Sequence, residues 1–221
     1  MDIKKRLKEI LDNLPNDVRV VATSKTHPNS AIMEAYSIGH RIFGENKVQE
    51  LLEKHASLPK DIEWHFIGHL QTNKIKLIVP FVALIHGVDS IKVLIEINKQ
   101  AILIDRKVKC LLQVHIAKED TKFGFTEKEI VSFFENREYL NFSNIEFSGL
   151  MGMASNTDDI SVVGGEFAGI KLLFDFCKTN LPDGSFDTLS IGMSGDYQLA
   201  IEDGGNLLRI GSSIFGHRDY D

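Results

Sequence analysis

The stretch VRVVATSK, residues 18–25, shows the pattern that decides the fold of this chain. It is a short apolar run rich in branched side chains, as expected for a buried parallel strand, and a helical period follows it. Seven similar runs come later, and a helix or helical turn follows each of them. The predicted strands are Val18–Thr23, Arg41–Phe43, Ile62–Phe66, Phe81–Ile85, Val108–His115, Ile145–Gly149, Thr188–Ile191 and Leu207–Ile210.

Eight strand–helix units in a row favour parallel pairing and closure of the sheet. We therefore predict an α/β fold, a TIM-type (β/α)8 barrel that forms one domain over residues 1–221. An extra helix over Asp2–Leu14 precedes the first strand and is expected to pack across an end of the barrel. Gly164-Gly165 is the best candidate for a flexible joint. The alternative fold is an open doubly wound sheet, although no GxGxxG motif follows the first strand.

Charge and composition limit the kinds of partner. The formal net charge is −6 and no dense run of Lys and Arg occurs, which argues against nucleic acid. The most apolar stretch, Ile75–Val88, is interrupted by polar residues and proline, so no membrane span is expected. Cys110 and Cys177 form no disulfide framework, and the N-terminus lacks a signal-peptide core, so we expect a cytoplasmic protein. No extended apolar helix face stands out, which favours a monomer.

Lys25 follows the first predicted strand almost directly. In barrels of this kind the working groups lie at the carboxyl ends of the strands, so we expect this side chain at the mouth of the barrel. A partly desolvated amine there is available for imine formation with an aldehyde. The alternative is a solvated lysine that merely ends a strand.

Two loops near the C-terminus have the composition of a phosphate site. GMSGD, residues 192–196, follows the seventh strand, and Gly211-Ser212-Ser213 follows the eighth. Backbone N–H groups at the start of a helix bind phosphate well, and barrels characteristically use the loops after strands seven and eight for this purpose. Each loop alone is also compatible with an ordinary helix cap.

Arg209 lies within the eighth predicted strand, where a buried charge needs a partner. An arginine beside a bound pyridine ring can donate to the ring nitrogen and keep it unprotonated, which makes the cofactor a weaker electron sink. The alternative is an ion pair with an acidic residue. Asn46, at the expected start of the second helix, could reach the imine side of the ring or simply begin the helix.

Histidines near strand ends raise the alternative of a metal-dependent barrel hydrolase. They are His65, His69, His86 and His115. No His-x-His pair occurs on the first strand and no paired carboxylates occur near the eighth, so we expect no metal site. His65 is expected to line the pocket, and the others are expected to form ordinary hydrogen bonds.

Six motifs spread over nearly the whole chain resemble the YggS/PROSC family of pyridoxal 5'-phosphate (PLP) homeostasis proteins. They are VATSKT (21–26), FGENKVQE (43–50), WHFIGHLQTNK (64–74), GLM (149–151), LSIGMS (189–194) and RIGSSIFG (209–216). The resemblance implies a barrel similar to the N-terminal domain of bacterial alanine racemase, with PLP held as a Schiff base on Lys25. Two positions depart from the family pattern. Ser212-Ser213 replaces Thr-Ala, and Phe123 replaces a serine in Lys122-Phe123-Gly124, which leaves the role of that loop open.

The resemblance also implies the composition of the cofactor site. Its implied residues are Lys25, Asn46, His65, Met153, Ser194, Arg209, Gly211 and Ser212. Ser194, Gly211 and Ser212 would hold the phosphate, and Arg209 would face the pyridine nitrogen. Asn46, His65 and Met153 would line the pocket.

The function implied by the resemblance is intracellular PLP homeostasis, with the chain as a carrier or buffer of PLP and PLP-requiring apoenzymes as candidate recipients. The second racemase domain, with its catalytic tyrosine, has no room after residue 221, so fast two-sided proton transfer is not expected. The alternatives are a weak PLP-dependent amino-acid racemase and a metal-dependent barrel hydrolase.

Overall fold

The computed structural model describes residues 2–117, 123–181 and 184–216, and the eight strands of this part form one parallel sheet. They are β1 (Arg19–Thr23), β2 (Ile42–Glu45), β3 (Glu63–Phe66), β4 (Leu84–Val88), β5 (Val108–Val114), β6 (Ile145–Gly152), β7 (Thr188–Ser190) and β8 (Leu207–Ile210). The order in the sheet is β7-β6-β5-β4-β3-β2-β1-β8, so strands that are consecutive in the chain are neighbours from β1 to β7, and β8 pairs with β1.

The two outer strands of this order, β7 and β8, meet and bring the sheet close to full closure. The backbone N–H of Asn206 donates to the carbonyl of Leu189 at 3.1 Å, and that of Arg209 donates to the carbonyl of Gly192 at 3.0 Å. An isolated parallel bridge also joins Met193 to Arg209. The predicted TIM-type (β/α)8 barrel is therefore confirmed, and the open doubly wound sheet was the wrong alternative.

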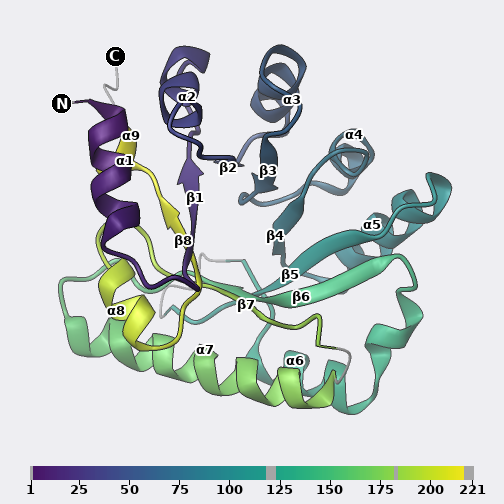
Figure 1. Ribbon diagram of the computed structural model, residues 1–221. Coiled ribbons are helices and arrows are strands. Elements are labelled where there is room, and N and C mark those ends of the chain that lie inside the picture. The colour runs from purple at the N-terminus through teal and green to yellow at the C-terminus, as the bar shows by residue number, and fades with distance from the viewer. Residues whose placement is uncertain (1, 118–122, 182–183, 217–221) are drawn as a thin grey trace.

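Helices surround the sheet between successive strands (Figure 1). They are α1 (Ile3–Asp12), α2 (Asn29–Tyr36), α3 (Val48–Ser57), α4 (Ile75–Ile78), α5 (Ile91–Leu103), α6 (Glu127–Glu135), α7 (Ile160–Asn180), α8 (Tyr197–Glu202) and α9 (Ser212–Phe215), with 3-10 turns η1 (Thr72–Lys74) and η2 (Glu138–Asn141). The extra N-terminal helix exists as α1. It contacts α2 and α9 and buries Leu7, so it joins the outer helix layer and does not cross an end of the barrel as expected.

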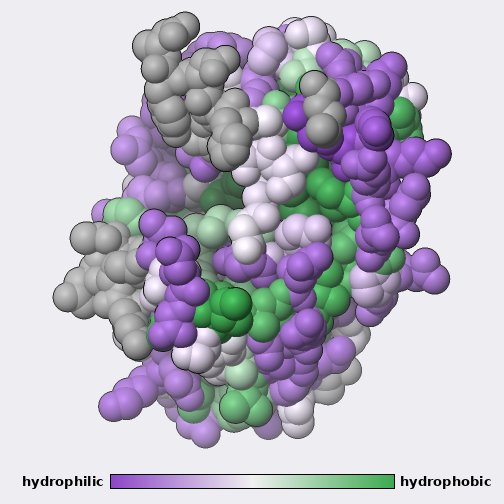
Figure 2. All heavy atoms as spheres, turned by 90° about the vertical axis from the view of Figure 1, so that its left-hand side faces the viewer, coloured by the Kyte–Doolittle hydropathy of each residue, from purple (hydrophilic) through white to green (hydrophobic). Residues whose placement is uncertain are grey.

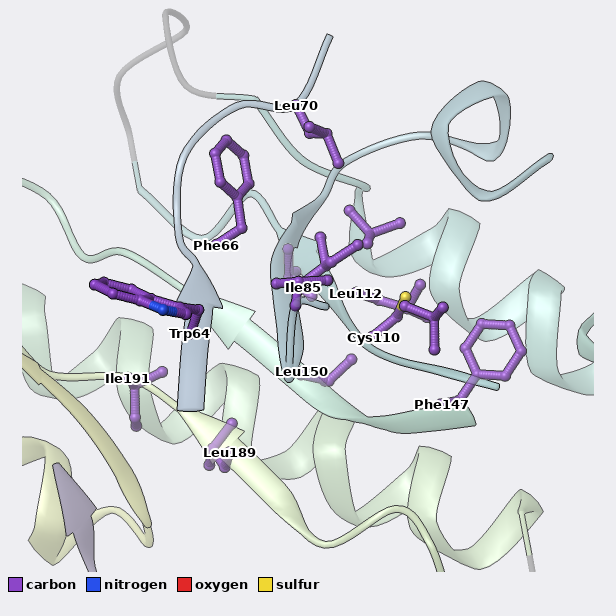
Figure 3. Close-up of a cluster of buried hydrophobic side chains, with 14 of the residues drawn as sticks. Trp64, Phe66, Leu70, Ile85, Cys110, Leu112, Phe147, Leu150, Leu189 and Ile191 are labelled. Carbon is purple, nitrogen blue, oxygen red and sulfur yellow. The ribbon is translucent and has the colours of Figure 1, made fainter. Parts of the chain in front are cut away.

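Alternating side chains divide the apolar residues of the strands into two clusters. On β1, Val20 and Ala22 point outward and Val21 points into the barrel. The outer cluster packs between sheet and helices, and Figure 3 shows part of it between β3 and β7. The inner cluster of buried side chains, within the described residues, comprises Val21, Leu84, Leu111, Met151 and Leu207.

The fourth strand was predicted at Phe81–Ile85 but lies at Leu84–Val88. The N–H groups of Phe81 and Val82 donate to the carbonyl of Ile78, so these apolar residues end the helical turn of α4. As a result His86, expected after the strand, lies within it and is fully buried.

Two further boundaries differ from the prediction. β2 continues to Glu45, which pairs with Phe66 of β3, so Asn46 lies in the loop after the strand and does not begin α3. Gly164-Gly165 lies inside α7 and forms no joint, because Val163 and Phe167 anchor this part of the helix in the core.

The surface in Figure 2 carries hydrophilic side chains around its periphery, and hydrophobic ones are visible between them. Among the residues that the structure describes, no helix combines the length and the apolar character needed to cross a membrane. Cys110 and Cys177 are both free and buried. Burial raises the pKa of Cys177 to about 12, so its thiol stays protonated at neutral pH.

Candidate functional site

A cavity of about 650 Å³ opens at the carboxyl ends of the strands. Its walls come from the strand ends and from the loops that follow them, which is where barrels of this type hold their ligands. Seven of the predicted site residues line it, namely Lys25, Asn46, Met153, Ser194, Arg209, Gly211 and Ser212. Residues that are far apart in the chain, from both of its ends, therefore share one cavity.

Lys25 reaches the cavity because of the alternation along β1. Val21 and Thr23 point into the barrel, and Lys25, two residues further on, continues the same face into the cavity wall. Its side chain is half-buried. The amine is thus presented to the cavity from the end of a strand whose backbone is paired on both sides.

Arg209 forms part of the cavity floor and is almost completely buried. Its Nη1 donates to the carbonyl and hydroxyl oxygens of Ser190, both at 2.7 Å, and its Nη2 donates to the carbonyl of Gly152 at 2.8 Å. In the described residues its hydrogen bonds go to neutral acceptors, and Asp196 acts on it only through its charge, without a direct contact. The alternative of a direct ion pair therefore finds no carboxylate partner in this part of the chain. Burial lowers its pKa to about 10, which still leaves a cation at neutral pH.

His65 lies in the barrel interior and is not among the residues that line the cavity. Its Nδ1 lies 2.9 Å from Nε2 of His86, and Nδ1 of His86 lies 3.1 Å from the hydroxyl of Ser190. Since Arg209 can only donate to Ser190, the hydroxyl proton is directed to His86, which in turn donates to His65. His65 therefore reaches the cavity only through a chain of hydrogen bonds that ends at Arg209.

His65 and His86, the two histidines of this hydrogen-bond chain, are neutral at physiological pH. Burial, with smaller effects of Arg19 and His40, lowers the pKa of His65 to about 3. Burial also lowers the pKa of His86 well below its usual value, and His65 and Arg209 add to this. A neutral pair keeps the chain of donors and acceptors unbroken and adds no charge beneath Arg209.

Ser194 joins the two predicted phosphate loops. Its hydroxyl oxygen accepts the backbone N–H of Gly211 at 3.2 Å and that of Ser213 at 3.3 Å. The loops after β7 and β8 therefore form one surface, in which Gly195 and Ser212 also face the cavity. Small side chains leave the backbone of this surface open to close approach by an anionic group.

Two buried polar atoms of the cavity residues have no hydrogen-bond partner among the described residues. They are Oγ1 of Thr23 and Oδ1 of Asn46. Buried polar groups in native proteins are nearly always satisfied, so these atoms indicate a bound polar molecule or water. Together with the Nε–H of Arg209, which has no acceptor within the described ranges, they fit a ligand with several donors and acceptors.

The sequence did not assign several other residues to the cavity, although His69 and Phe123 were named for other reasons. Thr23 carried a usable signal, since it lies two residues before Lys25 on the same strand face. Gln113 and the His69–Phe123 pair had none. His69 stacks on Phe123 at 4.2 Å between ring centroids, and its Nδ1 lies 2.6 Å from a carboxylate oxygen of Asp89. In the loop Lys122-Phe123-Gly124, which departs from the family pattern, Lys122 lies outside the described residues.

The histidines expected near strand ends do not converge on one point. His65 and His86 bond to each other, and His69 pairs with Asp89 at the rim. In the described ranges no three His, Cys, Asp or Glu side chains are grouped so that they could hold a metal ion. The hydrolase alternative therefore gains no donor set from this part of the chain.

Comparison with known proteins agrees with this geometry. Residues 2–219 match the family of the alanine racemase N-terminal domain. The pyridoxal phosphate homeostasis proteins of Vibrio alginolyticus and Homo sapiens are each 38% identical to the chain, over 93% and 99% of it and 89% and 85% of their own length.

Solved structures extend the comparison to the fold. PipY of Synechococcus elongatus without PLP superposes with a TM-score of 0.92 at 32% identity, over 97% of this chain and all of PipY. PipY with PLP bound gives 0.88 at 33% identity over the same shares. Alanine racemase of Clostridium difficile, at 14% identity, shares the fold over 57% of its length with a TM-score of 0.79. The chain belongs to the family of pyridoxal phosphate homeostasis proteins, which is built on the alanine racemase N-terminal domain.

Proposed function

We propose that this protein binds PLP covalently through Lys25 and acts in the cytoplasm as a carrier or buffer of PLP, which it passes to PLP-requiring apoenzymes. One observation carries the proposal. The lysine at the end of β1, Arg209 and the Ser194-linked loops line one cavity in a chain whose relative PipY was solved with PLP bound.

The residues of the cavity match the parts of PLP. PLP supplies an aldehyde that condenses with a primary amine, and it carries an anionic phosphate and a pyridine nitrogen. Lys25 provides the amine, and the surface formed by Ser194, Gly211 and Ser212 receives the phosphate. Arg209 would donate to the pyridine nitrogen, and Oδ1 of Asn46, which has no partner among the described residues, would accept a hydrogen bond from the ligand or from water around it.

The choice of a carrier over a fast racemase rests on Arg209. A group that can only donate keeps the pyridine nitrogen unprotonated, so the ring withdraws electrons less strongly than it does beside a carboxylate. The hydrogen bonds of Arg209 to Ser190 and Gly152 hold it in this role, and all three of these acceptors are neutral groups. We also propose that the chain acts as a monomer.

The proposal is tested by mixing the purified protein with PLP and following the visible absorption. Borohydride reduction followed by peptide mass mapping should place the adduct on Lys25. Lys25→Ala should lose both the band and the adduct, whereas Lys92→Ala, an exposed lysine at the start of α5 outside the cavity, should keep them. An adduct on another lysine, with Lys25→Ala unchanged, would overturn the proposal.

The racemase alternative predicts a different result. In deuterated water, exchange at Cα of added L-alanine should be slower than about 0.01 per second for a carrier. Rates of about one per second or more are typical of enzymes and would favour the racemase.

A further inference from the structure

A group of buried charged side chains from β2 and α3 lies beside the segment that follows β1 and carries Lys25. Glu45, the last residue of β2, is fully buried, and Lys54 of α3 has a side chain that is 6% exposed. α3 stands on the outer side of β2 and β3 (Figure 1). Since Lys25 faces the cavity, this group and the cavity lie on opposite sides of the same backbone.

Lys54 uses all three of its ammonium hydrogens in this group. Nζ donates to the carbonyl of Ser24 at 2.8 Å, to Oε1 of Glu45 at 2.9 Å and to Oε1 of Glu50 at 2.7 Å. The hydroxyl of Ser24 donates to the same Oε1 of Glu45 at 2.6 Å. The residue just before Lys25 is thus held through both its backbone and its side chain.

The residue just after Lys25 is held as well. The backbone N–H of Thr26 donates to Oε1 of Glu50 at 2.6 Å. Thr26 has a φ of 69°, which is a genuine outlier for a β-branched residue and persists only when the surroundings enforce it. We call Glu45, Glu50 and Lys54 the α3 clamp. Lys54 and Glu50 of α3 bind the backbone on either side of Lys25, and Glu45 of β2 holds the Ser24 hydroxyl and Lys54.

Fold stability alone does not account for the α3 clamp. Replacing a buried ion pair by apolar residues of similar volume often leaves the stability of a protein unchanged or increases it. Burial also raises the pKa of Glu45, opposed by Lys54, and Oε2 of Glu45 has no partner among the described residues. Strained backbone and buried charge beside one lysine are typical of a functional constraint.

We infer that the α3 clamp is a positioning device. It fixes the backbone from Ser24 to Thr26. The Cα–Cβ bond of Lys25 therefore has one position and one direction, and its side chain enters the cavity from there. This inference rests on the proposed function, and it assigns to Glu45, Glu50 and Lys54 the control of how fast and how tightly PLP attaches to Lys25. None of the three lines the cavity.

The main test removes the buried Glu45–Lys54 ion pair, so that neither partner leaves an unpaired charge, and keeps the bond of Glu50 to Thr26. The double variant Glu45→Gln/Lys54→Met should attach PLP about tenfold more slowly than the wild type and release it faster, as measured by stopped-flow absorbance. The adduct should still map to Lys25. Phe186→Leu serves as the control, because Phe186 is fully buried in the outer cluster away from the cavity. It should lower the melting temperature and leave the attachment rate unchanged.

A second pair of variants tests the acceptor of Thr26. Glu50→Gln keeps an oxygen for the Thr26 N–H and should lose less than threefold in attachment rate, whereas Glu50→Leu should lose about tenfold. Wild-type rates in the double variant, or equal losses in both Glu50 variants, would overturn the inference. If the wild type itself forms no adduct on Lys25, the proposed function fails, which is a separate outcome.

Discussion

The space outside the sheet and the space inside the barrel are filled differently. Outside, one large apolar cluster with many aromatic rings packs against the helices. Figure 3 shows part of it, with Trp64, Phe66 and Phe147. Inside, a small apolar cluster is followed toward the mouth by the buried polar residues His65, His86, Ser190 and Arg209. The outer layer therefore supplies most of the hydrophobic stabilisation, and the inner layer supplies hydrogen-bonding groups at the floor of the cavity.

This difference means that stability and ligand binding can be changed separately. Polar groups inside the barrel are buried at a cost that their mutual hydrogen bonds must offset. Acid, or the loss of one partner, should therefore disturb the inner layer specifically. Changes in the outer layer should act on stability and leave the cavity intact.

The largest expected effect is the response of the inner histidines to acid. The folded state holds the pKa of His65 at about 3 against an ordinary 6.5, so the unfolded state takes up the proton first. The contribution of His65 to the free energy of unfolding is therefore fully present above pH 6.5. It is lost as the pH falls toward 3, and the loss is on the order of 5 kcal/mol. The pH dependence of the free energy of unfolding, from urea titrations, should be flatter for His65→Gln/His86→Gln than for the wild type. Equal slopes would contradict the buried neutral pair.

In the outer layer, Phe186→Ala should lower the free energy of unfolding by about 3–5 kcal/mol, because it leaves a cavity beside Phe134 and Phe174. At 10 °C the folded fraction should still bind PLP with wild-type affinity. A loss of affinity larger than about threefold would mean that the two layers are coupled.

Arg209→Met should have a smaller effect on stability and a larger one on binding. The carbonyls of Ser190 and Gly152 lose their donor, which costs about 1–3 kcal/mol, and PLP affinity should fall at least tenfold. Arg19→Met is the matched control, since its guanidinium donates to Thr188 at the start of the strands and not in the cavity. Similar losses of PLP affinity in both variants would refute a specific role of Arg209.

The smallest effect is expected at the exposed surface of α7. Lys171→Met breaks an ion pair with Asp175 that lies largely in solvent. The free energy of unfolding should change by no more than about 0.5 kcal/mol, and PLP binding should not change. Thermal melts and absorbance titrations measure both. A loss above 1 kcal/mol would show that the surface contributes more than the comparison of the two layers assumes.

Much of the fold was predictable because each strand carries its own local signal. Apolar runs such as Val108–Val114 and Leu207–Ile210 were located within one residue, since buried parallel strands are almost continuously apolar. Phe81 and Val82 misled the prediction because an apolar residue at the end of a helix looks the same as one in a strand. Gly164-Gly165 misled it because packing of Val163 and Phe167 outweighs the low helix propensity of glycine.

Site residues were predictable where their position directly after a strand implied that they lie at the mouth of the barrel. Lys25 and the loops around Ser194 and Gly211 follow strand ends, and a closed barrel brings strand ends together. The place of His65 was not predictable, because it depends on His86, and His86 was assigned outside its strand. The α3 clamp was also hidden, since a lysine on a helix is ordinarily exposed.

By itself, the sequence determined the alternation of strands and helices, because each element has a local pattern. It also determined that the sheet closes into a barrel and which segments lie at the barrel mouth, because both follow from the geometry of parallel sheets. Only the tertiary structure decided which polar groups satisfy one another: the chain from His65 to Arg209 and the bonds of Lys54 to Ser24 and Glu50. Hydrogen bonds between distant side chains depend on positions to within about half an ångström, and no local pattern specifies these.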